Sequence, residues 1–224
     1  MSDIKLYNGD CLELMKSIPD KSVDLILTDP PYGIDLTPQR AGGRFKNTKV
    51  INDNTLDWLD SFVDESYRIA KNATCVFCGW QNIDKFKIAF EKKFIVKNVL
   101  VWNKDWFSMG NNYRPNYELI LLLCKTNLTT KSKNKSNILT YRRLSPQKMK
   151  HSCEKPVALI EDLIVELSNE GEIVLDPFMG VGSCGVACIN TNRNFIGIEL
   201  DEGYYNIAKE RIESAQSNID SCDE

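Results

Sequence analysis

The stretch IVLDPFMGVGSCGVACI, residues 173–189, carries the pattern that decides the fold class. Its first three residues are aliphatic and predict a buried strand, and residues 184–189 predict a helix. Between them lie Gly180 and Gly182, where a ligand can approach the backbone closely because glycine has no side chain. The acid Asp176 stands at the strand end itself. A strand, a glycine-rich turn and a helix in this order are typical of α/β folds.

The rest of the chain alternates strand-like and helix-like segments in the same way. Strands are expected at 4–7, 23–27, 74–78, 94–102, 117–124, 173–175 and 195–198, and helices at 11–18, 56–71, 83–91, 160–167, 184–189 and 204–214. Residues 33–55 and 126–136 lack apolar periodicity and are expected to be loops. The alternation predicts one α/β domain, residues 1–216, with a mainly parallel sheet and helices on both faces. A disordered acidic tail is expected at 217–224.

Composition and length indicate an ordinary globular protein. The 224 residues are 42% hydrophobic, which is enough for a sizeable core. No apolar run approaches the ~20 residues of a membrane span, and the polar N-terminus does not resemble a signal peptide. We therefore expect a cytoplasmic protein without a membrane partner.

The eight cysteines predict no metal site. Only one CxxC pair occurs, Cys75 and Cys78, in an apolar run that predicts a buried strand, and His151 is the only histidine. No second pair stands at the spacing of metal ligands. The pattern favours reduced structural thiols.

The residues around the turn at 176–183 favour one kind of cofactor. A dinucleotide would place its diphosphate on the helix N-terminus, where the carboxylate of Asp176 would repel it. The same carboxylate can attract a cationic amine, such as the methionine moiety of S-adenosylmethionine. Glu199 ends the next strand, where it can accept hydrogen bonds from both hydroxyls of a ribose. A dinucleotide site and a plain tight turn remain the alternatives.

A second strand end carries the tetrapeptide Asp29-Pro30-Pro31-Tyr32. Methylation of an exocyclic amine on an aromatic ring requires the nitrogen to become more tetrahedral, because its lone pair is delocalised into the ring. Asp29 supplies a carboxylate and Pro30 a carbonyl, and both can accept the N–H groups of such an amine. Tyr32 can stack on the ring. A surface turn is the alternative, but the buried strand before it and the independent turn at 176–183 favour catalysis.

In the order and identity of these motifs, the chain resembles the amino-methyltransferases that act on adenine N6 or cytosine N4 in DNA. The tetrapeptide precedes the cofactor glycines, as in the circularly permuted beta class. The resemblance covers nearly the whole chain and implies a Rossmann-like fold that uses S-adenosylmethionine, with Asp10 on the cofactor adenine. It implies catalytic roles for Asp29, Pro30, Pro31 and Tyr32, and cofactor contacts by Asp10, Cys11, Asp29, Lys155, Asp176, Pro177, Phe178, Met179, Gly180, Gly182, Ser183, Glu199 and Leu200.

Two segments depart from the family pattern. Residues 151–156, HSCEKP, resemble the family's His-Pro-Thr-Glu/Gln-Lys-Pro segment near the methionine end of the cofactor, but Ser and Cys replace its Pro and Thr. Lys155 keeps the family's lysine. Met179 and Val181 stand where many relatives have a smaller residue and a serine. These departures concern the fine contacts to the cofactor.

The basic residues are unevenly distributed, although the net charge of the chain is −3. Between positions 125 and 155 stand nine Lys or Arg residues and one acid. The resemblance implies duplex DNA as the partner, from which the target base must be flipped out. Contacts to DNA phosphates are expected from two basic segments. These are Arg40, Arg44, Lys46 and Lys49 in the first, and Arg142, Arg143 and Lys148 in the second.

Little of the chain is available for target recognition. Beta-class relatives carry a larger insert between their two halves, whereas this chain has only a short basic insert at about 126–150. The resemblance therefore implies a very short target sequence, help from the loop at 33–55, or help from a second subunit in a homodimer. Residues 102–104 end a predicted strand and are expected near the pocket for the flipped base, with core packing as the alternative for Trp102.

Adenine N6 is the target that the tetrapeptide favours, because cytosine-N4 enzymes usually have a serine in place of Asp29. Cytosine N4 remains an alternative. An RNA or protein-glutamine methyltransferase is another, since related tetrapeptides act on planar amides, but the permuted motif order argues against it. A catalytically silent binding subunit is the last alternative, and intact Asp29, Gly180 and Gly182 argue against it.

Overall fold

The computed structural model of the chain describes residues 2–35, 53–106, 112–145, 147, 149 and 154–220. Most of the loop expected at 33–55 lies outside these residues. Among the residues described, no helix combines the length and the apolar composition that crossing a membrane requires.

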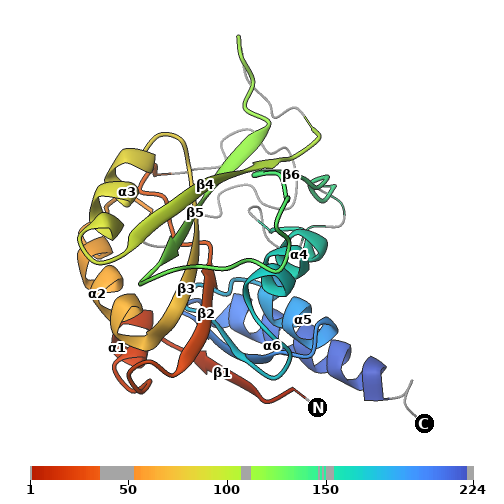
Figure 1. Cartoon of the computed structure of the whole chain (residues 1–224). Coiled ribbons are helices and arrows are strands. Elements are labelled where there is room, and N and C mark those ends of the chain that lie inside the picture. The colour runs from red at the N-terminus through yellow and green to blue at the C-terminus, as the bar shows by residue number, and fades with distance from the viewer. Residues whose placement is uncertain are drawn as a thin grey trace.

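An eight-stranded sheet forms the centre of the described part of the chain (Figure 1). Its strands are β1 (Ile4–Asn8), β2 (Val23–Thr28), β3 (Ala70–Cys78), β4 (Ile95–Asn103), β5 (Tyr117–Cys124), β6 (Ile138–Thr140), β7 (Ile173–Asp176) and β8 (Asn194–Glu199). They lie in the order β1-β8-β7-β2-β3-β5-β4-β6. β5 runs antiparallel to β3 and β4, and the other neighbouring strands are parallel. The predicted α/β fold with a mainly parallel sheet is confirmed, and its strand order is compatible with the permuted class.

Helices cover both faces of the sheet, as predicted. Figure 1 shows α1 (Cys11–Met15), α2 (Leu59–Ile69) and α3 (Ile83–Glu91) on one side, and α4 (Val157–Leu167), α5 (Ser183–Asn190) and α6 (Glu202–Asp220) on the other. Side chains along a strand point alternately to the two faces. In β2, Ile26 accordingly belongs to the core under α1–α3, whereas Leu25 and Leu27 belong to the core under α4–α6.

Three elements differ most from the prediction, and the bounds of several others differ by up to three residues. Strand β6 lies within the expected insert at 126–150, and its single buried side chain, Leu139, gives no periodic signal. β3 begins at Ala70 instead of 74, because it follows directly on the end of α2. Helix α6 continues to Asp220 and so extends into the segment 217–224 that was expected to be a disordered tail. Residues 221–224 lie outside the described residues.

Two neighbouring strands bring the two sequence motifs together. β2 and β7 are parallel, with Leu25 opposite Val174 and Ile26 opposite Leu175. At their carboxyl ends, the hydroxyl of Thr28 donates a hydrogen bond to Asp176 Oδ1 at 2.7 Å, across 148 positions of sequence. The tetrapeptide that follows Thr28 therefore lies beside the glycine-rich turn that follows Asp176.

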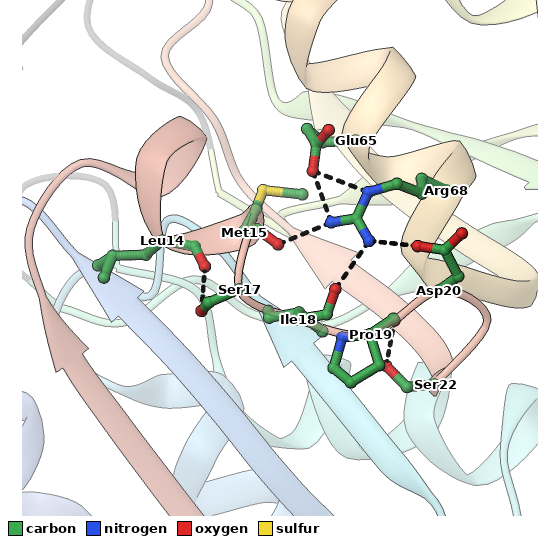
Figure 2. Close-up of polar contacts among 9 residues, drawn as sticks. All are labelled: Leu14, Met15, Ser17, Ile18, Pro19, Asp20, Ser22, Glu65 and Arg68. Atoms are coloured by element: carbon green, nitrogen blue, oxygen red, sulfur yellow. Dashed lines mark hydrogen bonds and ion pairs between the residues drawn. The ribbon is translucent and has the colours of Figure 1, made fainter.

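Arg68 of α2 stabilises the C-terminal end of the short helix α1 (Figure 2). Its guanidinium donates hydrogen bonds to the carbonyl oxygens of Met15 at 2.9 Å and Ile18 at 2.8 Å. It also forms ion pairs with Asp20 at 2.6 Å and Glu65 at 2.7 Å. The Met15 carbonyl also accepts from the backbone N–H of Ile18 at 2.9 Å, and Ile18 lies beyond the end of α1. Arg68 therefore adds a second donor at Met15 and holds the chain after α1 against α2.

We expect Arg68→Met to lower the free energy of unfolding by about 2–4 kcal/mol, because the Ile18 carbonyl loses its donor, the Met15 carbonyl loses one of its two donors, and two carboxylates lose a counter-ion. Urea unfolding followed by circular dichroism measures the change. Lys16→Met is the control, since it removes only the exposed Lys16–Glu13 pair, and should change stability by less than about 0.5 kcal/mol. Equal losses in the two variants would contradict the stabilising role of Arg68.

Candidate active site

A cavity of about 610 Å³ lies at the carboxyl edge of the sheet, between the tetrapeptide and the turn after β7. Pockets for small ligands occupy roughly 300–1,000 Å³, and in α/β sheets they form at this edge. The structure brings most of the predicted site residues together around this cavity. They are Asp10, Cys11, Asp29, Pro30, Pro31, Tyr32, Arg143, Lys155, Asp176, Pro177, Phe178, Met179, Gly180, Ser183, Glu199 and Leu200.

Asp29 is the first residue after β2, and both oxygen atoms of its carboxylate accept hydrogen bonds. Oδ1 accepts from the hydroxyl of Tyr32 at 2.6 Å, and Oδ2 accepts from the ammonium group of Lys155. An ionised carboxylate offers about four acceptor positions. Asp29 can therefore still accept hydrogen bonds from a ligand in the cavity.

Three residues outside the tetrapeptide hold it in place. Asp53 accepts a hydrogen bond from the backbone N–H of Gly33 at 2.9 Å, and Asn82 Nδ2 donates to the backbone carbonyl of Tyr32 at 2.8 Å. Gly79 lies against the Tyr32 ring, where a Cβ atom would come within 3.1 Å of Cδ2. The backbone and the ring of Tyr32 are thus fixed from two sides.

Lys155 lies between two carboxylates on the wall of the cavity. Its side chain is 6% exposed, and besides Asp29 it contacts Glu118 Oε2 at 3.1 Å. The other oxygen of Glu118 accepts a hydrogen bond from Lys104 Nζ at 2.5 Å. Two ammonium groups and two carboxylates therefore form one partly buried cluster.

The pKa values of the two carboxylates in this cluster shift in opposite directions. Burial raises the pKa of Asp29; the Lys155 ammonium opposes part of that rise, and the Glu118 carboxylate adds to it. Burial alone would raise the pKa of Glu118 as well, but the ammonium groups of Lys155 and Lys104 outweigh it and lower this pKa to about 2. Glu118 is consequently ionised at neutral pH.

Backbone N–H groups of the turn after β7 donate hydrogen bonds to two more acids, Asp176 and Glu199. Asp176 Oδ1 accepts from the Thr28 hydroxyl at 2.7 Å and from the backbone N–H of Phe178 at 3.1 Å, and burial raises the pKa of Asp176 to about 7. Glu199, at the end of β8, accepts from the backbone N–H of Gly180 at 2.9 Å. Gly180 has a φ of +53°, and a Cβ there would meet nothing within 4 Å, so its backbone is open to the cavity.

Gly182 differs from the prediction, because it is absent from the residues that line the cavity. It is the N-cap of α5 with a φ of +82°. A Cβ atom there would come within 3.0 Å of Ala208 and 3.2 Å of Ile212, both on α6. A glycine at 182 therefore permits close packing of α5 on α6.

Asp10, Cys11 and Phe178 line the cavity, and Asp10 and Phe178 also stabilise the elements around it. Asp10 Oδ1 caps α1 by accepting from the backbone N–H of Leu12 at 2.8 Å. Burial raises the pKa of Cys11 to about 12, so this thiol stays protonated. The ring of Phe178 packs 5.5 Å from Trp58 and 5.4 Å from Phe62, centroid to centroid, which supports the turn from behind.

The described residues around the turn fit S-adenosylmethionine. Among them, the hydroxyl oxygen of Ser183 is buried without a hydrogen-bond partner, and Ser183 lines the cavity. Buried polar atoms in proteins are normally satisfied, so this hydroxyl calls for a polar group of a ligand. The buried carboxylate of Asp176 suits an ammonium group, and Glu199 suits hydroxyl donors.

The residues expected to contact DNA are only partly described. Arg143 lines the cavity, and the guanidinium of Arg142 lies 5.3 Å from the ring centroid of Trp106. The other five expected contacts, Arg40, Arg44, Lys46, Lys49 and Lys148, lie outside the described residues, as do His151, Ser152 and Cys153. Trp102 and Lys104 line the cavity, as expected for residues 102–104, although Trp102 is also a core residue.

Glu118 and Trp80 are among the cavity residues that the sequence patterns do not identify. Glu118 lines the cavity from the start of β5, and its signal is a lone charge directly before the aliphatic run 119–123. Trp80 follows β3 and also lines the cavity, although 57% of its surface is exposed. Its signal is an aromatic residue directly after a glycine at a strand end.

A family model described as DNA methylase matches residues 23–210. Among proteins of similar sequence, YubD of Escherichia coli (strain K12) is 32% identical over 215 residues, which cover 95% of this chain and 91% of that protein. The DNA adenine methyltransferase YhdJ of the same organism is 29% identical over 248 residues, covering 94% of this chain and 83% of that protein.

Solved structures of methyltransferases have the same fold. The crystal structure of the M1.HpyAVI-SAM complex matches with a TM-score of 0.74 and 28% identity, covering 93% of this chain and 98% of that one. The cytosine-N4-specific PvuII DNA methyltransferase also matches with a TM-score of 0.74, covering 98% of this chain and 93% of that one. Its identity of 18% supports a likeness of fold alone.

Proposed function

The chain belongs to the DNA methylase family that acts on adenine N6 or cytosine N4, and we propose that it is a site-specific DNA adenine-N6 methyltransferase. S-adenosylmethionine is the cofactor of this family, and the protein is a DNA methyltransferase that uses it. The observation that carries the adenine proposal is the carboxylate of Asp29 at the head of the tetrapeptide, beside the cofactor turn on the neighbouring strand. The likeness to the adenine methyltransferase YhdJ supports it.

Within this proposal, the tetrapeptide binds and orients the target amine. Asp29 and the carbonyl of Pro30 accept the two N–H groups of the exocyclic amine, which draws the nitrogen lone pair out of the ring plane toward the methyl group. The ring of Tyr32 stacks on the flipped base, while its hydroxyl stays on Asp29 at 2.6 Å. Proline fixes the backbone on either side of this carbonyl, so little reorganisation is needed.

The turn after β7 binds the cofactor, which supplies a methyl group already activated on a sulfonium sulfur. Asp176 holds the ammonium group of the methionine moiety, Glu199 accepts from the ribose hydroxyls, and Asp10 accepts from the adenine amine. Gly180 leaves the backbone accessible, and the hydroxyl of Ser183 gains a partner. These residues orient the methyl group toward the amine held by Asp29.

Arg142 and Arg143 contact the phosphates of duplex DNA in this proposal, together with the five basic residues outside the described part of the chain. Both follow β6, and Arg143 lines the cavity that receives the flipped base. Contacts of this kind fix the register of the protein on the duplex but read no sequence.

Mass spectrometry of nucleosides tests the choice of base. Duplex DNA is incubated with the protein and S-adenosylmethionine carrying a labelled methyl group, and is then digested to nucleosides. We expect labelled N6-methyladenine. Labelled N4-methylcytosine without N6-methyladenine would overturn the adenine proposal. Parallel incubations with RNA and with protein test the remaining substrate classes, and label in either of these without label in DNA would overturn the DNA substrate.

A further inference from the structure

Glu118 reaches the catalytic edge of the sheet because β5 runs opposite to its neighbours. In β5, Leu119 pairs with Cys78, the last residue of β3, and Glu118 pairs with Trp102 near the end of β4. The first residues of β5 therefore lie where the neighbouring strands end. Along β5, Glu118 shares a face with Ile120 and Leu122, which belong to the core on the α4–α6 side. The carboxylate is thus placed on the cavity wall by the sheet itself.

Two hydrogen-bond donors are shared between Glu118 and Asp29. The ammonium group of Lys155 contacts both carboxylates, at 3.1 Å from Glu118 Oε2. The hydroxyl of Tyr32 lies 2.6 Å from Asp29 Oδ1 and 3.3 Å from Glu118 Oε2. Lys104 binds the second oxygen of Glu118 at 2.5 Å. Glu118 is therefore a second acceptor for the same two donors that occupy Asp29.

This sharing matters because Asp29 has to accept hydrogen bonds from the substrate. If Lys155 were held by Asp29 alone, all of its N–H donors and its positive charge would face that carboxylate. They would then compete with the target amine for the acceptor positions of Asp29. A second carboxylate divides the lysine between two acceptors. It also balances the cluster, since two carboxylates then face the ammonium groups of Lys155 and Lys104. Burial of an unbalanced charge would be costly.

We propose that Glu118 is a positioning residue of the methyl-transfer site, which shares Lys155 and Tyr32 with Asp29 and so keeps Asp29 able to accept the target amine. This role rests on the proposed function, because it acts through Asp29. Glu118 itself does not bind the base in this proposal; it orients Asp29 and Tyr32, which do.

Steady-state kinetics of Glu118→Gln tests the role, because glutamine keeps the shape of the side chain and removes its charge. We expect kcat to fall about 10- to 100-fold, as for small misplacements of catalytic groups. The dissociation constant for S-adenosylmethionine, measured by calorimetry, should stay within about threefold, since the loss concerns the transition state. Glu65→Gln is the matched control: Glu65 is a partly buried glutamate on α2 that pairs with Arg68 and does not belong to the described residues lining the cavity, so this variant should keep kcat.

The pH profile of kcat separates positioning from a structural role. The charged and titratable groups that face Glu118 are Lys104, Lys155, Asp29, Tyr32 and Cys78. The Glu118 charge raises the pKa of Asp29, so Glu118→Gln should move the acid limb of the profile to lower pH. Glu118→Asp keeps the charge and should leave the limb in place, with a kcat between those of the wild type and Glu118→Gln.

The outcomes separate this inference from the proposed function. If the wild type methylates DNA and Glu118→Gln has the same kcat and pH profile, the positioning role is overturned and the proposed function stands. If the wild type does not methylate DNA, the proposed function fails, and the inference fails with it. If Glu118→Gln does not fold, Glu118→Asp decides: a wild-type kcat overturns the role, and a reduced kcat with unchanged cofactor affinity supports it.

Discussion

Asp29→Ala is expected to abolish detectable methyl transfer, with kcat lowered by about 10³-fold or more, in the upper range found for acid–base and acceptor groups. The carboxylate is the acceptor that polarises the target amine, and alanine offers none. Binding of S-adenosylmethionine should survive, because Asp176, Glu199 and Ser183 lie on other elements. Transfer of labelled methyl groups to duplex DNA and calorimetry with the cofactor measure the two properties separately.

A second pair of variants controls for damage to the strand. Asp24 lies on the same strand, β2, where it pairs with Lys71 at 2.6 Å and accepts from the backbone N–H of Ile173 at 3.0 Å. Asp24→Asn should keep turnover, whereas Asp29→Asn should lose most of it. Unchanged turnover in Asp29→Ala would refute the role of Asp29 as the acceptor that polarises the target amine.

Asp176→Asn is expected to weaken S-adenosylmethionine binding about 100-fold, the effect of truncating one partner of a buried, hydrogen-bonded charge pair. Asparagine keeps an oxygen that accepts from Thr28 and from the Phe178 backbone, so the turn should persist. Its lost charge removes the attraction for the ammonium group of the cofactor. Equilibrium binding by calorimetry at pH 8 measures the effect, and an unchanged dissociation constant would contradict the role of Asp176.

The same variant should stabilise the protein without cofactor. Burial raises the pKa of Asp176 from 3.8 to about 7, so its ionisation opposes folding. This penalty is absent below pH 3.8, grows as the pH rises toward 7, and is complete above 7, where it amounts to roughly 4 kcal/mol. The thermal midpoint of Asp176→Asn should therefore exceed that of the wild type more at pH 8 than at pH 4. A constant difference would show that the Asp176 carboxyl does not titrate abnormally.

The pKa of Asp176 also predicts how cofactor binding depends on pH. Below about pH 7 the carboxyl of the wild type carries a proton that must leave before the ammonium group binds. The dissociation constant should rise up to tenfold for each pH unit below 7. Asp176→Asn should show a weaker dependence over the same range.

The central strands and the two motifs were predictable from the sequence because their signals are local. The tetrapeptide and the turn at 176–183 each follow an aliphatic run, and parallel strands end at a common edge. The proximity of Asp29 and Asp176 follows from these two facts. Lys155 was predictable only through the family resemblance, since the chain around it carries no periodic pattern that would place it beside Asp29.

The remaining features depend on pairings between distant segments. Nothing local in the run 117–124 indicates that β5 runs antiparallel, and only that direction brings Glu118 to the catalytic edge. The reason for a glycine at 182 lies on α6, at Ala208 and Ile212. The strand β6 exists because β4 offers it an edge. A local sequence pattern predicts the structure of its own segment. It does not predict which distant segment will pack or pair against that segment.

The order of the strands also constrains when the protein can fold. Among the described strands, β1 pairs with β8 alone, which ends at Glu199, and one side of β2 is covered by β7, which begins at Ile173. During synthesis β1 stays unpaired until β8, in the last part of the described chain, has been made. Pairings of such high contact order fold slowly, and unpaired strand edges invite aggregation meanwhile. Nascent chains stalled before Ile173 would accordingly need protection by a chaperone.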